Sequence, residues 1–164
     1  MLLKKKIYDI QHTFDNLTAA EGRIFPVMNL PSINPKSNDC LNTRFNKNTL
    51  ILLYTHFDCG SCVNTTIQTL SKFNKKHNQK INIFGIANTE KPIEIWKRTR
   101  AIASFPVYQD LNDSTSIFNR FKNTAFPLLL FILGNNNRII YAKKATNNSE
   151  EMNSYIKRFE NWIE

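Results

Sequence analysis

Residues 49–62 read TLILLYTHFDCGSC, an apolar run of strand length that leads directly into two cysteines at C-x-x-C spacing. Every position of Leu50–Tyr54 is apolar, which is typical of a strand that is buried on both faces. Beyond the cysteines, apolar residues recur at helical spacing, at Val63, Ile67, Leu70 and Phe73. We therefore predict that Cys59 and Cys62 lie where a buried strand passes into an amphipathic helix that ends near His77.

A second apolar run, Ile81–Ala87, follows this helix. A strand, a helix and a strand in this order form a βαβ unit, so the two strands are expected to be parallel and joined by a right-handed crossover. A further helix is predicted after Thr89, with its inner face formed by Ile93, Trp96 and Ile102.

The rest of the chain continues the alternation of helices and strands. A short strand is predicted over Phe105–Tyr108 and a short helix over Ser114–Phe121. Pro127–Leu133 and Arg138–Lys143 flank Gly134–Asn137, whose glycine and asparagines accept the positive φ values of a hairpin turn. The last helix carries an apolar stripe at Met152, Tyr155, Ile156, Phe159 and Ile163.

The N-terminal part differs in character from the rest. Leu3, Ile7, Ile10, Phe14 and Leu17 predict an amphipathic helix. Glu21–Asn48 contains three prolines and reads as an extended lead-in, with a short edge strand at Arg23–Met28. We expect residues 1–48 to form an N-terminal helix and lead-in, and residues 49–164 to form an α/β domain. The predicted fold class is an α/β/α sandwich on a mixed sheet, with a parallel βαβ unit, a C-terminal hairpin and a closing helix.

The composition is that of a soluble globular protein, with 41% hydrophobic and 21% charged residues in 164. No stretch approaches the roughly 18 apolar residues of a spanning helix. The net charge of +9 is spread along the chain without the signature of a nucleic-acid-binding module, so nucleic acid is not expected as a partner. The basic start, Met1–Ile7, allows proximity to an anionic membrane but lacks the apolar run and cleavage site of a secretion signal. These residues fit a cytoplasmic protein, and a periplasmic or envelope-attached one if a signal or anchor has been trimmed.

The three cysteines favour redox chemistry over a structural role. They are too few for a disulfide scaffold, and zinc lacks a second ligand pair, so no metal and no cofactor are expected. At the start of a helix, the Cys59 thiolate would face unpaired backbone N–H groups and the positive end of the helix dipole. Cys62, one turn later, points the same way, so we predict that Cys59 attacks a substrate disulfide and Cys62 resolves the intermediate. Cys40 is a spare thiol or a partner for an intermolecular disulfide.

From Thr49 to its C-terminus the chain resembles the thioredoxin superfamily, within it the TlpA/ResA-like and AhpC/TSA-related proteins. The resemblance rests on Cys59–Cys62, on the β-α segment Phe105–Phe121, and on Ala125–Leu128 before the hairpin. It implies a thiol–disulfide oxidoreductase of cell redox homeostasis, with protein dithiols and disulfides as substrates and a redox partner protein. It also implies that Pro127 is a cis-proline beside the cysteines and that Phe126 offers its backbone to an extended substrate. Relatives of the TlpA type are usually exported or membrane-tethered in bacteria.

The sequence departs from the family at several positions. Phe57 and Asp58 precede the motif in place of the frequent tryptophan, and Asp58 would oppose a thiolate if its carboxylate lay close. Leu50–Tyr54 holds no acidic residue that could assist proton transfer, and His56 is the nearest titratable group. The peroxiredoxin pattern Pro-x-x-x-Thr-x-x-Cys is absent, with Leu52 and His56 at its Pro and Thr positions.

Several functions therefore stay open beside the oxidoreductase. They are a non-catalytic binding module, a thiol peroxidase, and a copper(I)-handling protein in which His56 joins the two thiolates. Among the aromatic residues near the motif, Phe57 and Phe126 are predicted to form an apolar rim for the substrate, whereas Tyr54 and Phe105 are expected in the core.

Overall fold

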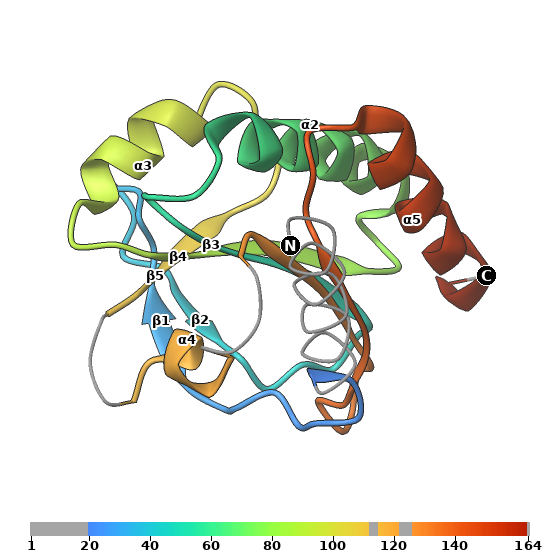
Figure 1. Ribbon diagram of the computed structural model, residues 1–164. Helices are drawn as coiled ribbons and strands as arrows, with labels where there is room; N and C mark the ends of the chain where they lie inside the picture. Colours follow the sequence, from blue (N-terminus) through green and yellow to red (C-terminus); the bar gives the residue numbers. More distant parts are fainter. Residues whose placement is uncertain (1–19, 112–114, 122–125, 164) are drawn as a thin grey trace, which may run out of the picture.

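The computed structural model describes residues 20–111, 115–121 and 126–163 (Figure 1). The helix predicted around Leu3–Leu17 lies outside these residues. Within them the main sheet has five strands in the order β5-β4-β3-β6-β7. These strands are β3 (Thr49–Thr55), β4 (Asn82–Asn88), β5 (Val107–Asp110), β6 (Leu128–Ile132) and β7 (Ile139–Lys144). β3 occupies the centre, because its apolar residues are buried on both faces of the sheet.

The register of the sheet confirms the predicted βαβ unit and hairpin. β3 pairs in parallel with β4, and β4 in parallel with β5. On the other side, β3 pairs antiparallel with β6, which forms a hairpin with β7. The carboxyl ends of the three parallel strands consequently meet at one edge of the sheet, and this edge carries the cysteine motif.

Three helices cover one face of the sheet (Figure 1). They are α2 (Gly60–His77), α3 (Pro92–Thr99) and α5 (Ser149–Ile163). Alternate residues of β3 point toward them, and Leu50, Leu52 and Tyr54 share a buried cluster with the apolar stripes of α2 and α5. The inner face of α3 differs from the prediction. Ile93 is 51% exposed, whereas Ile95 is buried together with Thr99 one turn later.

The opposite face is covered by the lead-in and a short helix. The lead-in forms a separate ribbon of β1 (Asn29–Pro31) and β2 (Cys40–Asn42), and the short helix is α4 (Ile117–Arg120), capped by the Ser116 hydroxyl. A second core packs between these elements and the sheet, and the lead-in contributes Phe25, Leu30, Leu41 and Phe45 to it. The lead-in is therefore an integral part of the hydrophobic core.

The edge strand predicted at Arg23–Met28 is wrong. Only Ile24 makes an isolated bridge, with Arg138, and regular pairing begins at Asn29. Pro26 lacks a backbone donor and therefore interrupts a ladder. Its carbonyl instead accepts a hydrogen bond of 2.6 Å from the Thr43 hydroxyl.

One buried asparagine joins the hairpin turn to the lead-in. Asn137 adopts a φ of 54°, and its side-chain amide donates to the carbonyls of Phe25 at 3.3 Å and Thr43 at 2.6 Å. Its side-chain oxygen accepts from the backbone N–H of Phe45 at 3.1 Å. A single side chain thus satisfies three buried backbone groups that water cannot reach.

Replacing this side chain should destabilise the whole domain. We expect Asn137→Ala to lower the free energy of unfolding by about 3 to 5 kcal/mol, because three buried polar groups lose their partner. Asn136→Ala removes an exposed hydrogen bond to the Arg138 N–H and should cost less than about 1 kcal/mol. Denaturant unfolding of both variants measures this difference. Equal losses would contradict the role assigned to Asn137.

Candidate active site

A tight turn connects the end of β3 to the start of α2. The carboxylate of Asp58 accepts a 2.6 Å hydrogen bond from the backbone N–H of Thr55, and the Asp58 N–H donates to the Thr55 carbonyl at 3.3 Å. The hydroxyl of Thr55 accepts from the N–H of Phe57 at 3.2 Å. These bonds end the strand and leave Cys59 as the N-cap residue of α2.

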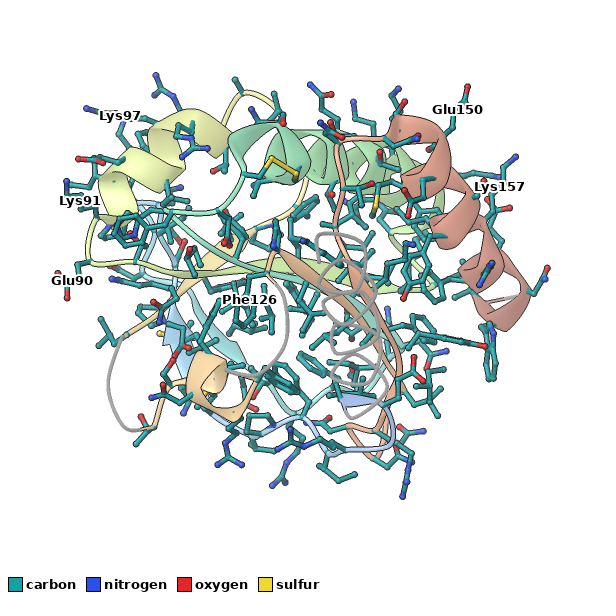
Figure 2. The ribbon with its side chains drawn as sticks, in the orientation of Figure 1. Glu90, Lys91, Lys97, Phe126, Glu150 and Lys157 are labelled. Carbon is teal, nitrogen blue, oxygen red and sulfur yellow. A yellow bond between two sulfur atoms is a disulfide. The ribbon has the colours of Figure 1, made fainter. Side chains whose placement is uncertain are left out.

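The two cysteines share the first turn of α2 and are joined by a disulfide, drawn as the yellow bond in Figure 2. The Cys59 sulfur accepts a hydrogen bond from the backbone N–H of Cys62 at 3.3 Å and contacts the Ser61 hydroxyl at 3.2 Å. Cys59 is exposed, whereas Cys62 is half-buried. The outer sulfur is thus the one that a macromolecular disulfide can reach, and two polar groups already face it.

Phe126 and Pro127 stand at the same edge of the sheet. The register of β3 with β6, continued by two residues, sets Pro127 opposite Tyr54 and Phe126 opposite Thr55. The Phe126–Pro127 peptide bond is cis, as the family resemblance implies. The ring of Phe126 is half-buried and packs on Phe118 at 4.9 Å between centroids, so this ring belongs mainly to the second core (Figure 2).

The other aromatic residues near the motif divide between surface and core. Phe57 is 85% exposed and is the most exposed large apolar side chain among the described residues. Tyr54 and Phe105 are buried, as expected for core residues. The ring of His56 lies 3.8 Å from that of Phe57, centroid to centroid, and its Nδ1 is buried without a hydrogen-bond partner. His56 is therefore half-buried, and among the described residues its Nδ1 neither faces solvent nor has a hydrogen-bond partner.

The charge of Asp58 is unfavourable where it lies. Burial raises the pKa of the Asp58 carboxyl from its ordinary value of 3.8, against the hydrogen bonds from Thr55 and the charges of His56 and Lys144. The carboxylate points back toward Thr55. One of its oxygens accepts the hydrogen bond from the Thr55 N–H at the end of β3.

The position of Arg98 and the environment of the Tyr54 hydroxyl are the features of the site that the sequence did not predict. Nη2 of Arg98 lies 3.5 Å from the point that a Cβ on Gly60 would occupy, so the guanidinium stands beside the residue that follows Cys59. The Tyr54 hydroxyl is buried and has no hydrogen-bond partner among the described residues. Burial raises its pKa, while the charge of Arg98 lowers it. No sequence pattern joins α3 to the motif. The connections β3–α2–β4 and β4–α3–β5 both join parallel strands and are both expected to be right-handed. This shared handedness is the only indication that α3 lies on the same face of the sheet as α2.

The described residues include neither a cluster of metal-ligating side chains nor a membrane-spanning helix. They contain no group of three or more His, Cys, Asp or Glu side chains arranged to hold a metal ion. Within the same residues, no helix has the length and apolar character needed to cross a bilayer.

Comparison with known proteins rests on structure. The sequence matches no protein-family model and no curated protein. The structure is similar to that of a Chlorobium tepidum protein assigned as a thiol:disulfide interchange protein, DsbE. The TM-score is 0.71 at 13% identity over 88% of this chain and 98% of that chain.

Two further solved structures are similar to this one over most of the chain. One is a secreted Mycobacterium tuberculosis disulfide oxidoreductase homologous to DsbE of E. coli, with a TM-score of 0.60 at 15% identity over 80% of this chain and 95% of that one. The other is StoA from Bacillus subtilis, with a TM-score of 0.59 at 12% identity over 81% of this chain and 98% of that one. The chain therefore has a thioredoxin-like α/β fold. This confirms the predicted fold class and, at the level of fold, the resemblance to TlpA/ResA-like proteins.

The raised pKa of Asp58 gives a signed dependence of stability on pH. Between pH 3.8 and the raised pKa the folded state binds more protons than the unfolded state, so ionisation of Asp58 lowers the free energy of unfolding as pH rises. Asp58→Asn keeps an acceptor for the Thr55 N–H and removes this dependence. The variant should therefore gain stability relative to wild type as pH rises from about 3.8, and the gain should level off above the raised pKa.

Denaturant unfolding of the oxidised proteins between pH 3 and 8 measures this difference, since the disulfide keeps both thiols from titrating. A difference that stays flat across this range would show that Asp58 is not strained by burial.

Proposed function

We propose that this protein is a thiol–disulfide oxidoreductase in which Cys59 and Cys62 alternate between a dithiol and a disulfide. The observation that carries the proposal is the exposed Cys59 sulfur at the N-cap of α2, which accepts the Cys62 N–H and contacts the Ser61 hydroxyl. A thiolate in this place gains from the same donors and from the helix dipole, which together favour the charged, nucleophilic form. The likeness of the fold to disulfide oxidoreductases supports this class of reaction.

The reaction is a pair of thiol–disulfide exchanges. The Cys59 thiolate attacks one sulfur of the substrate disulfide, the substrate S–S bond breaks, and the released sulfur takes up a proton. The Cys62 thiol then loses its proton and attacks the Cys59 sulfur of the mixed disulfide. The second substrate thiol leaves, and Cys59–Cys62 is oxidised by two electrons. A dithiol of a redox partner protein returns the pair to the reduced form by the reverse exchange.

Phe57, Phe126 and Pro127 are proposed to receive the substrate. Phe57 is exposed two residues before Cys59, and Phe126 and Pro127 stand at the same edge of the sheet. An extended polypeptide that carries a disulfide can pair with the backbone at Phe126 while an apolar residue covers the ring of Phe57. The proposed substrates are therefore protein disulfides with neighbouring apolar residues.

The proposed attack by Cys59 predicts which cysteine is trapped. In a Cys40→Ser background, which removes the exposed free thiol, Cys62→Ser treated with oxidised glutathione should form a stable mixed disulfide at Cys59. Cys59→Ser should react more slowly, because Cys62 is half-buried. Intact-mass measurement over time, followed by peptide mapping, identifies the modified residue. Faster modification of Cys62 would reverse the assigned roles. Absence of any reversible two-electron couple in a glutathione redox series would overturn the proposed function.

The exposed ring of Phe57 predicts a selective effect on large substrates. Phe57→Ser should lower kcat/KM about fivefold for a disulfide-bonded peptide with apolar flanks, because covering part of a phenylalanine contributes about 1 kcal/mol. The rate with oxidised glutathione, which is too small to cover the ring, should not change. Trp162→Ser, which alters another exposed aromatic residue at the far end of α5, serves as the control. Equal losses on both substrates would exclude a role for Phe57 in recognition.

A further inference from the structure

Arg98 reaches the cysteine motif from a helix that lies far away in the sequence. Its Nη2 is 3.5 Å from the Cβ position of Gly60, the residue between Cys59 and Ser61. Its charge also lowers the pKa of the buried hydroxyl of Tyr54. Tyr54 is the last of the β3 residues that point into the core beneath α2 and α5. The distance to Gly60 thus places this guanidinium at the start of α2, and its electrostatic effect on Tyr54 agrees with that position.

The charge of Arg98 has no partner of its own. Within the described part of the chain it makes no ion pair and no hydrogen bond. Its neighbours on α3 face elsewhere. Lys91 pairs with Glu94 at 3.6 Å, the labelled side chains of Lys91 and Lys97 extend into solvent (Figure 2), and Arg100 lies over the ring of Trp96 at 4.7 Å. An unpaired cation beside the motif stabilises a negative charge that forms there.

The charged and polar groups around the motif leave few other sources of stabilisation for a thiolate at Cys59. The Asp58 carboxylate is the nearest acidic group in sequence, but it accepts a hydrogen bond from the Thr55 N–H, and the charge of Lys144 lowers its pKa. Gly60 and Ser61 carry no charge. The thiolate of Cys59 therefore depends on the backbone donors of α2, the Ser61 hydroxyl and whatever cation is within reach.

We propose that Arg98 stabilises the Cys59 thiolate and thereby makes the Cys59–Cys62 disulfide easier to reduce. This inference rests on the proposed function. Only the reduced form carries a charge at Cys59, so a nearby cation favours the dithiol over the disulfide. The equilibrium that reports this effect is the exchange with glutathione. Two glutathione thiols reduce the Cys59–Cys62 disulfide to the dithiol, two electrons pass to the protein, and one glutathione disulfide forms. Arg98 acts through Cys59 and is a positioning residue in this scheme.

Removing the charge measures the effect directly. In the Cys40→Ser background, Arg98→Gln should raise the ratio [GSH]²/[GSSG] at half-reduction about two- to fivefold, the range for an exposed charge pair. The alkylation rate of Cys59 by iodoacetamide at pH 6 should fall by a similar factor, since only the thiolate reacts. Arg98→Lys should restore most of both values. Arg100→Gln removes an equal charge from the end of the same helix and should leave both unchanged.

Salt supplies a readout that a purely structural role of Arg98 would not move. Raising the ionic strength from 20 mM to 500 mM should narrow the difference between wild type and Arg98→Gln, because exposed charges are screened. Identical values for wild type and Arg98→Gln would overturn the proposal. A loss that Arg98→Lys does not restore, or one that persists at high salt, would overturn the electrostatic explanation. A wild-type protein without a glutathione-dependent couple would instead refute the proposed function, because no midpoint could be measured.

Discussion

The hydrogen bond from the Thr55 N–H to the Asp58 carboxylate is the constraint on which the site depends. It ends β3 and turns the chain, so that Cys59 becomes the N-cap of α2 rather than one more residue of the strand. The Cys62 N–H, which would otherwise lack a partner in the first turn, then donates to the Cys59 sulfur. The cost is a carboxylate held in a half-buried place, where burial raises its pKa. Local geometry and electrostatics at the motif are thus set by the same bond.

The order of the elements could be predicted because each has a local cause. The apolar runs of β3 and β4, the stripe on α2 and the turn at Gly134–Asn137 follow from periodicity and from residues that tolerate positive φ. The predictions that were wrong concern features that depend on contacts distant in the sequence. Ile95 rather than Ile93 faces inward on α3 because the helix packs over a sheet whose position its own short pattern does not specify.

The lead-in shows the same limit on a larger scale. Its prolines and asparagines read as irregular chain, yet Phe25 and Phe45 are core residues held in place by Asn137 from the hairpin, 112 and 92 positions away in the sequence. A hydrogen bond of this kind has no signature in either segment alone. The hydrophobic content of the lead-in, rather than its irregular appearance, was the signal that it helps to bury the sheet.

The candidate site divides between local and distant contributions in the same way. The cysteine spacing, the strand before it and the helix after it were sufficient to predict that the two cysteines lie at a helix N-terminus, because that terminus is formed by adjacent residues. The cation beside that terminus comes from α3, 38 positions after Gly60, and follows from the two right-handed crossovers on one face. The motif itself carries no charge between its cysteines, so on the proposed role of Arg98 the balance between dithiol and disulfide is adjusted by a helix outside the motif. A helix of this kind can change without disturbing the strand-to-helix turn. The position of the pair, set by the turn, and the poise of its disulfide are then separable properties of the fold.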